Sequence, residues 1–472
     1  MMIEQGKCPC VLLFHASSGM NVGDDAQMYA TVRRLEKHVP GVQVIIARMF
    51  QGKPPDLLPG HEFVPAPHLY INKRSLFLRA ILKALRTCGW RSCAELLDTF
   101  LSLTRAFMLL SAVRFYRSTG RLPLLGKDVR NAVRTISQCD VVYCSGGGNL
   151  NDVFLSRGLV SRAAVFRLAE ILRRPVVVSG QGVGPLKSHV GRYLLRRWGR
   201  SVEFFGCRDM RESRDLLLDI GFDEQRVMSL GDDATDLCTS SRDRVSEILA
   251  EEGLTTNGEP PVYVHIRLHN FSQGFREKGI PAMARFLDRV IERFGCRIVF
   301  LPISYARQRA YDDDIGDAFE VYTSMRNRSS VSFINKHRYS PPDMKGIIAS
   351  GKFLIGFSYH SWVFALSSGI PAFAVFSGEY FRAKAAGLFA WYGRESWVWE
   401  MSELGGGAPL EEISSVLAHY DADRRDLLEK TARIAAQVNK PIDFINTKLV
   451  GSGEARHDQS DPTRNSPSII GE

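Results

Sequence analysis

The stretch LIGFSYHSWVFALSSGIPAFAVF, residues 354–376, decides the fold. Its pattern predicts an apolar strand, a polar turn, a helix, a Gly-Ile-Pro turn and a second apolar strand. Both strands are continuously apolar instead of alternating, so each is expected to be buried on both faces of a parallel sheet, with the helix as the crossover. The single histidine of the stretch, His360, is then placed where a buried strand meets a helix N-terminus.

The same alternation of strand and helix signals runs through most of the chain. Helical periodicity separates apolar, β-branched runs, and a polar, turn-rich stretch near 240–260 interrupts the series. The pattern predicts an α/β fold of two Rossmann-like doubly wound domains facing a cleft, with ligands at the carboxyl ends of the strands. Strands are expected at 10–15, 42–47, 140–145, 175–180, 203–208, 226–231, 261–267, 296–302, 330–334, 351–357 and 371–376.

The domain boundaries follow from shifts in composition. We expect an N-terminal domain over 1–240, a C-terminal domain over 241–410, a helical segment over 411–450 and a disordered polar tail over 451–472. Residues 69–126 interrupt the N-terminal domain with helical, apolar and arginine-rich sequence. Two interpretations of this insertion stay open: helices packed on the N-terminal half, or a face that contacts a membrane or docks an acceptor.

Composition narrows the classes of function. The 472 residues have a formal charge of +10 that is spread along the chain, which favours anionic small molecules or an anionic membrane surface and argues against nucleic acid. The nine cysteines include no pair of C-x-x-C motifs, so no metal site is expected. The N-terminus does not resemble a signal peptide, and no stretch of about 18 uncharged apolar residues suggests a membrane span. We therefore expect a cytoplasmic protein.

The segment SGMNVGDDAQMYATVRRL, residues 18–35, carries the first candidate site. Asn21 and Gly23 are expected to form a turn after the first strand, and Asp24 and Asp25 to open a helix. Asp24 could be the helix N-cap, or the two acids could bind sugar hydroxyls and exchange protons with them. Both alternatives stay open, since one carboxylate can cap while the other faces the cleft.

Two glycine-rich turns follow later strands. CSGGGNLND, residues 144–152, predicts a strand, a glycine turn and a helix, whose free N–H groups would suit an anion. SGQGVGP, residues 179–185, is not a dinucleotide fingerprint, because proline follows its last glycine. Tight strand-to-helix turns without a ligand are the alternative. The residues singled out are Gly146, Gly147, Gly148, Asn149, Gln181 and Gly182.

Basic residues stand at two further strand ends. Arg208 is expected to form an ion pair with a neighbouring aspartate, with entry into the cleft as the alternative. In VHIRLHNF, residues 264–271, the alternating His265, Arg267 and His269 would share one face of a continuing strand. A basic triad at the end of a strand predicts an anion site.

Taken in order, these motifs resemble the polysaccharide pyruvyl transferase family. The matching segments are Gly19 to Ala26, 146–149, 180–185, Arg208 to Ser213, Asp232 to Ala234, Val262 to Arg267 and 358–384, and the resemblance covers about 15–390 without the insertion. It implies a glycosyltransferase-B-like fold and transfer of pyruvate from phosphoenolpyruvate to a sugar of a cell-surface polysaccharide, or of its lipid-linked precursor, as a ketal. It implies no cofactor besides phosphoenolpyruvate as co-substrate.

The resemblance also suggests roles for single residues. His360, Asp24 and Asp25 would be catalytic, and the N-terminal domain would hold the acceptor. The C-terminal domain would hold the donor through cations and hydrogen-bond donors of its cleft wall. The donor-binding candidates are Arg267, His265, His269, Lys384, Ser358 and Tyr380.

The sequence departs from the family at one position. The family has an arginine two residues before the histidine, and this chain has Ser358. A serine offers one neutral hydrogen bond where arginine binds an anion through two charged ones. Two other functions therefore remain as alternatives: a nucleotide-sugar glycosyltransferase of the same architecture, and a non-catalytic protein that binds glycan or scaffolds a complex.

Overall fold

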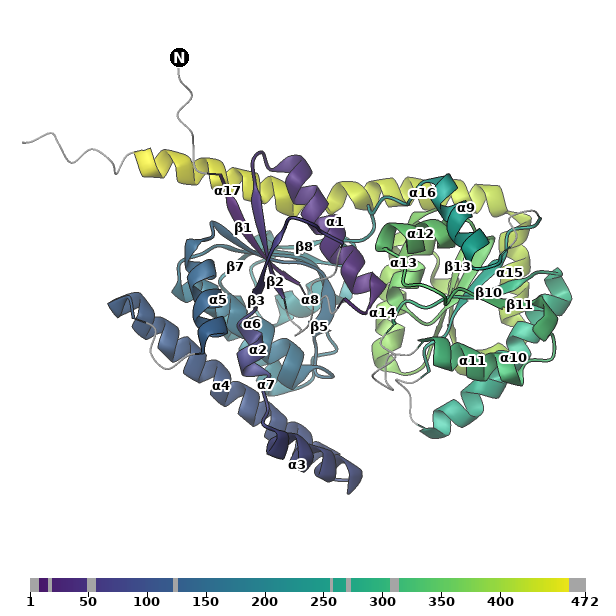
Figure 1. Cartoon of the computed structure of the whole chain (residues 1–472), viewed down its shortest axis with the longest axis horizontal. Helices are drawn as coiled ribbons and strands as arrows, with labels where there is room; N and C mark the ends of the chain where they lie inside the picture. Colours follow the sequence, from purple (N-terminus) through teal and green to yellow (C-terminus); the bar gives the residue numbers. More distant parts are fainter. Residues whose placement is uncertain are drawn as a thin grey trace, which may run out of the picture.

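The computed structural model describes residues 8–15, 19–48, 57–121, 126–254, 258–268, 273–305 and 314–457. The chain forms two parallel β-sheets, each covered by helices (Figure 1). The predicted pair of Rossmann-like domains with glycosyltransferase-B-like architecture is confirmed. Each of the eleven predicted strands overlaps an observed one, whereas β3, β5 and β14 were missed because they are short and carry weak apolar patterns.

The N-terminal sheet has the order β3-β2-β1-β4-β6-β7-β8, with β5 paired to β6. Its register is parallel throughout, as in Val11↔Val44 and Val11↔Val141. The strands are β1 (Cys10–His15), β2 (Gln43–Arg48), β3 (Glu62–Pro65), β4 (Val141–Cys144), β5 (Gly147–Leu150), β6 (Val176–Val183), β7 (Val202–Cys207) and β8 (Val227–Ser229). The helices are α1 (Val22–His38), α2 (His68–Ile71), α3 (Leu76–Thr87), α4 (Arg91–Thr119), α5 (Lys127–Gln138), η1 (Leu155–Leu159), α6 (Val160–Ile171), α7 (His189–Gly199), α8 (Glu212–Asp219) and η2 (Glu224–Arg226).

The C-terminal sheet has the order β11-β10-β9-β12-β13-β14 and is also parallel. Its strands are β9 (Val262–His265), β10 (Ile298–Phe300), β11 (Val331–Phe333), β12 (Phe353–Gly356), β13 (Ala372–Phe376) and β14 (Val398–Glu400). The helices are α9 (Arg242–Glu251), α10 (Gln273–Phe294), α11 (Asp314–Ser324), η3 (Arg328–Ser330), α12 (Pro341–Ala349), α13 (Tyr359–Ser367), α14 (Glu379–Tyr392), η4 (Glu395–Trp397), η5 (Met401–Gly405), α15 (Ala408–Ala418), α16 (Tyr420–Gln437) and α17 (Lys440–His457).

The opening stretch 354–376 spans β12, α13 and β13, as its pattern predicts. β12 and β13 are neighbours in the sheet, with Ile355 opposite Phe373. Both strands and every residue of α13 are buried, so the helix has no polar outer face. This burial explains the continuous apolar pattern, because α13 is covered on its outer side by α16 and is in contact with α1.

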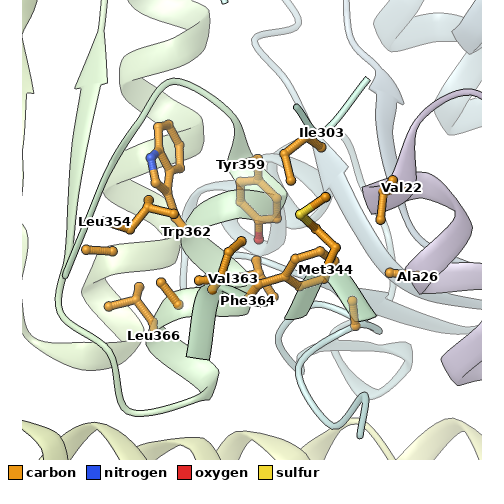
Figure 2. Close-up of a cluster of buried hydrophobic side chains, with 14 of the residues drawn as sticks. Val22, Ala26, Ile303, Met344, Leu354, Tyr359, Trp362, Val363, Phe364 and Leu366 are labelled. Carbon is orange, nitrogen blue, oxygen red and sulfur yellow. The ribbon is translucent and has the colours of Figure 1, made fainter. Parts of the chain in front are cut away.

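Helix α1 joins the two domains. It follows the first strand of the N-terminal sheet but packs against α12 and α13 of the C-terminal domain. Figure 2 shows Val22 and Ala26 of α1 beside the C-terminal cluster around Met344 and Phe364, and all four belong to one hydrophobic core. The backbone N–H of Val22 also donates to the carbonyl of Ile303 at 2.8 Å. The first turn of α1 is therefore fixed at the domain boundary.

The C-terminal helices cross back over the first domain. α16 packs on α13 and α14, whereas α17 lies along β6 and β7 of the N-terminal sheet (Figure 1). Asn446 of α17 donates to the carbonyl of His38 at the end of α1. The predicted disordered tail from residue 451 is wrong for 451–457, which continue α17. The rest of the tail lies outside the described residues.

The insertion 69–126 forms most of α2 and all of α3 and α4. α4 packs along α6, and its buried face consists of small or apolar residues and Asp98. The carboxylate of Asp98 accepts hydrogen bonds from Arg74 at 2.8 Å and from Ser156 at 3.1 Å. The interpretation as helices packed on the N-terminal half is thus confirmed for one face of α4. By length and composition α4 could also cross a membrane, contrary to the expectation that no segment qualifies.

Candidate active site

A cleft of about 500 Å³ lies between the carboxyl ends of the two sheets. The N-terminal domain contributes the first turn of α1, the glycine turn before β5 and the end of β7. The C-terminal domain contributes the segment after β9, the start of α13 and the first turns of α14. The sequence-predicted residues that line the cleft are Asn21, Asp24, Gly147, Gly148, Asn149, Arg208, Arg267, Ser358, His360, Tyr380 and Lys384.

At the start of α1 the carboxylate of Asp24 lies in the cleft, whereas that of Asp25 lies outside it. Asn21, not Asp24, is the N-cap: its side-chain oxygen accepts from the N–H of Gly23 at 2.9 Å and of Asp24 at 3.4 Å. The alternative of Asp24 as the cap is therefore wrong, and Asp24 lines the cleft. Asp25 is fully buried and accepts a hydrogen bond from Arg338 of the C-terminal domain. The prediction that Asp25 faces the reaction site is wrong, because this ion pair holds it at the domain interface.

His360 lies against the first turn of α1. A Cβ atom added to Gly23 would stand 2.1 Å from its Nδ1, so only glycine permits this approach. The Nε2 atom lies 4.0 Å from a carboxylate oxygen of Asp232, which follows β8. The imidazole is 7% exposed and reaches the cleft at the N-terminal end of α13. An acid–base group is therefore fixed between the two domains.

The Asp232 carboxylate is a site residue that sequence reasoning did not select. It accepts a hydrogen bond from the amide of Gln27 at 2.6 Å. Burial raises its pKa to about 6, although the positive charge of Arg208 opposes the shift. The signal was present in the motif LGDDATDL, where two acids follow a strand, but only the fold brings this turn to His360.

Arg208 enters the cleft instead of forming the expected ion pair. Its guanidinium carbon lies 4.1 Å from the ring centroid of Tyr359, and among the described residues no carboxylate lies within ion-pair distance. A Cβ atom at Gly182 would stand 2.6 Å from its Nε, and one at Gly148 would stand 2.7 Å from an Nη atom. The two glycines thus make room for the guanidinium. The predicted ion pair is wrong because Asp209 instead accepts from the N–H of Ser213 at 2.8 Å.

The predicted basic triad after β9 does not act as one anion site. His265 is fully buried and its Nε2 lies 2.9 Å from a carboxylate oxygen of Asp314. Arg267 binds the same carboxylate through two bonds, Nε at 2.8 Å and Nη2 at 2.7 Å, while still lining the cleft. The assignment of His265 to donor binding is therefore wrong. His269 lies outside the described residues.

The buried carboxylate of Asp314 binds both His265 and Arg267. It also accepts from the backbone N–H groups of Ile303 at 2.9 Å and Ser304 at 2.6 Å. Burial alone would raise the pKa of the Asp314 carboxyl, but the charges of Arg267 and His265 outweigh it and hold the pKa well below its usual range. The carboxylate therefore stays ionised and stabilises the loops that follow β9 and β10.

Tyr380 and Lys384 of α14 complete the C-terminal wall. The Tyr380 hydroxyl donates to the carbonyl of Gly148 at 3.3 Å, across the domain boundary. The Lys384 ammonium lies 4.7 Å from the centroid of the Tyr380 ring and has no carboxylate partner within ion-pair distance among the described residues. Burial lowers the pKa of Lys384, an effect partly opposed by Tyr380.

The first glycine turn leads into a strand, not into the helix that the sequence predicts. After Gly146 the chain forms β5, because Gly147 takes a φ of 127° and pairs with β6, so no helix N-terminus follows directly. The N–H of Gly146 donates to Asp233 at 2.9 Å and is thereby occupied. Gln181 is fully buried and donates to the carbonyl of Ser145 at 3.1 Å. Gly146 and Gln181 support the cleft from behind, whereas Gly147, Gly148 and Asn149 line it.

The electrostatics of the cleft suit an anion and a proton transfer. Burial, with a further contribution from the adjacent Asp25, raises the pKa of Asp24 to about 7, although Lys384, Arg267 and Arg208 oppose the shift. A carboxyl with this pKa exchanges protons near neutral pH. No group of three or more potential metal-ligating side chains occurs in the part of the chain that the structure describes. Further lining residues that the sequence did not indicate are Val153, Phe154, Phe357, Tyr359, Trp362 and Phe381.

Comparisons with known proteins agree with this architecture. A family model described as polysaccharide pyruvyl transferase matches residues 21–377. No curated protein sequence matches the chain. Among solved structures, Anabaena HepE in complex with UDP-glucose has a TM-score of 0.54 at 12% identity and covers 94% of this chain and 99% of its own. UDP-GlcNAc 2-epimerase from Neisseria meningitidis, bound to UDP-GlcNAc, has a TM-score of 0.54 at 12% identity, covering 93% and 100%.

Proposed function

Because the chain belongs to the polysaccharide pyruvyl transferase family, we propose that it transfers pyruvate from phosphoenolpyruvate to a saccharide and forms a ketal. The observation that supports this most is the charge arrangement of the cleft. Arg208 and Lys384 line one cleft without carboxylate partners among the described residues, together with the proton-exchanging groups Asp24 and His360. A donor with a phosphate and a carboxylate needs such cations.

The proposed chemistry balances without a cofactor. A proton is added to the methylene carbon of phosphoenolpyruvate, and a sugar hydroxyl forms a bond to its C2 while giving up its own proton. The bond between C2 and the phosphate oxygen then breaks, phosphate leaves with the electron pair, and a second hydroxyl closes the ketal. The products are the pyruvate ketal and inorganic phosphate. Of the two protons that the sugar hydroxyls lose, one restores the proton that the enzyme gave to the methylene carbon, and the other is carried away by the phosphate.

The geometry suggests which group performs each step. Asp24, with a pKa of about 7, can hold the proton for the methylene carbon or accept one from the hydroxyl, and His360 performs the complementary transfer. Arg208 and Lys384 bind the two anionic groups of the donor. Ser358 is 4% exposed and makes no side-chain cap of α13, so its position adds no charge to the cleft. In this proposal the cations that bind the donor are Arg208 and Lys384, because the position of the family arginine is occupied by Ser358.

The test measures donor use directly. Purified protein incubated with phosphoenolpyruvate and a panel of saccharides should release phosphate and yield a pyruvyl ketal detectable by mass spectrometry. His360→Gln should abolish turnover, whereas the matched variant of an exposed histidine, His419→Gln, should leave it unchanged. Absence of turnover with all acceptors, together with no thermal shift by phosphoenolpyruvate, would contradict the proposal.

The nucleotide-sugar alternative is tested in the same assay. The fold is shared with proteins solved with UDP-glucose or UDP-GlcNAc, which is the observation in its favour. Stabilisation by UDP and not by phosphoenolpyruvate would favour a glycosyltransferase. Retention of biological function by His360→Gln would favour a non-catalytic glycan-binding protein. The cytoplasmic location and a lipid-linked acceptor remain predictions from the sequence.

A further inference from the structure

Helix α4 is apolar on two opposite faces. One face is buried against the protein through residues that include Ala94, Ala106 and Val113. The other is exposed and carries large side chains, with Leu96 71% and Phe100 66% exposed. At 100° per residue the exposed residues fall within about 120° of the helix circumference. These residues are Leu96, Phe100, Phe107, Met108 and Phe115.

The exposed stripe continues onto the neighbouring helices. α3 packs against α4 and adds Leu76 and Phe77, and the turn between the two helices adds Trp90, which is 63% exposed. The ring of Phe107 lies 5.5 Å from that of Trp198 in α7, whose exposed face carries Val190 and Tyr193. Figure 1 shows α3 and α4 on the side of the N-terminal domain away from α17. We call these residues of α3, α4 and α7 the outer helical surface.

The outer helical surface has a predominantly basic surrounding. In residues 69–126 the acids are Glu95 and Asp98, and Asp98 is buried and paired with Arg74. Exposed cations of α3 and α4 therefore outnumber the one exposed acid, Glu95. They include Arg79, Lys83, Arg86 and Arg114. A contiguous group of exposed apolar side chains with cations nearby is typical of a surface that contacts anionic lipid.

We propose that the outer helical surface docks on the surface of an anionic bilayer. Phenylalanine, tryptophan and leucine would enter the interfacial region, while the arginines and lysines would contact lipid phosphates. α4 lies on the bilayer and does not span it, because its inner face is committed to α6 and to the Asp98 carboxylate. This docking does not depend on the proposed chemistry.

The docked orientation has a consequence for the cleft. The Asp98 carboxylate accepts hydrogen bonds from Ser156 and Arg157, which lie in η1 directly after Val153 and Phe154. Val153 and Phe154 line the cleft and are themselves exposed. The outer helical surface and the mouth of the cleft are therefore held together by one buried carboxylate. If the proposed function also holds, an acceptor attached to the bilayer would lie near the cleft.

Vesicle sedimentation with the full chain tests the docking. The protein should sediment with vesicles of phosphatidylcholine mixed with phosphatidylglycerol, much less with phosphatidylcholine alone, and less at high salt. Phe100→Ser combined with Phe107→Ser should weaken binding by more than about tenfold, since two large apolar side chains no longer enter the bilayer. The matched variant Phe319→Ser, on the exposed face of α11, should bind as the wild type does.

A second measurement keeps the proposal falsifiable if the double variant fails to fold. Trp90 is far more exposed than the buried Trp362, Trp397 and Trp399, so brominated lipid should quench a fraction of the fluorescence that Trp90→Phe removes. Absence of sedimentation or of this quenching would overturn the proposal. Equal sedimentation of the double variant and the wild type would also overturn it. A dimer in solution that Phe100→Ser disrupts, without vesicle binding, would assign the surface to a second copy of the chain.

Discussion

Arg208 and Arg267 both follow a parallel strand, and both line the candidate cleft, but their guanidinium groups have different neighbours. Arg267 binds Asp314 through two hydrogen bonds. Arg208 lies over the ring of Tyr359, between two glycines. An anion at Arg267 must compete with a carboxylate that is hydrogen-bonded to the guanidinium. At Arg208 no carboxylate of the described residues lies within ion-pair distance, and the charge of Asp232 acts on it only from farther away. The pairing of a cation, more than its place in the cleft, therefore determines whether it is available to bind a ligand.

The largest effect should come from removing the cation without a carboxylate partner. Arg208→Met keeps the length of the side chain and should lower kcat/KM for phosphoenolpyruvate by about 10³-fold, because a preorganised charge is lost. The melting temperature should change little. Arg267→Met is the comparison variant. It should lower the melting temperature clearly but change the affinity for phosphoenolpyruvate, measured by calorimetric titration, much less than Arg208→Met does. An equal loss of donor affinity in both variants would break the distinction between the two arginines.

The second effect concerns the carboxylate that holds Arg267. Asp314→Asn should lower the free energy of unfolding by about 3 kcal/mol, since it leaves buried cations without their partner. Urea unfolding followed by circular dichroism measures this. Asp421→Asn, in the first turn of α16, provides an exposed control that should stay near wild-type stability. A fully stable Asp314→Asn variant would show that the buried cluster is not structural.

Lys384 sharpens the comparison from the other wall. Lys384→Met should raise KM for phosphoenolpyruvate about tenfold, because one of the two cations that bind the donor is lost while Arg208 remains. The exposed Lys187, paired with Glu379 at 2.8 Å, supplies a control for a lysine at the neighbouring surface. Steady-state kinetics of both variants decide the question. A larger effect from Lys187→Met than from Lys384→Met would place the donor elsewhere.

The smallest effect is a pH dependence of stability from Asp24. Its pKa is raised from 3.8 to about 7, so between these values the unfolded chain has lost the proton that the folded chain still binds. Stability should therefore fall as the pH rises through this window, and the loss should be complete above pH 7. Asp24→Asn should reduce that fall by on the order of 1 kcal/mol after solvent screening.

The measurement is urea unfolding of the wild type and Asp24→Asn below pH 5 and above pH 7. Asp232→Asn serves as a second case, because burial raises that pKa to about 6 and its window ends lower. An identical pH dependence of the wild type and Asp24→Asn would show that folding does not raise the pKa of Asp24. It would also remove its assignment as the proton-exchanging carboxyl.

Much of the fold followed from local pattern. The strand and helix order around 354–376 is recognisable because continuous apolar strands occur only where a sheet is covered on both faces. The cleft position of Asp24, Arg208, His360 and Lys384 follows from the same rule, since the carboxyl ends of parallel strands meet at one edge. The short β3 and β5 were not recognisable, because their residues do not carry an apolar pattern.

The sequence by itself determined the two doubly wound sheets, the family and the set of residues at the strand ends, because these depend on residues close together in the chain. The tertiary structure alone decided which charges are paired. Asp314 is 47 residues from Arg267, and Asp25 is 313 residues from Arg338, so no local pattern links either pair. The first pairing depends on how two loops meet inside the C-terminal domain, and the second on how α1 meets that domain. Together they remove His265 and Asp25 from the cleft while leaving Arg208 and Asp24 there.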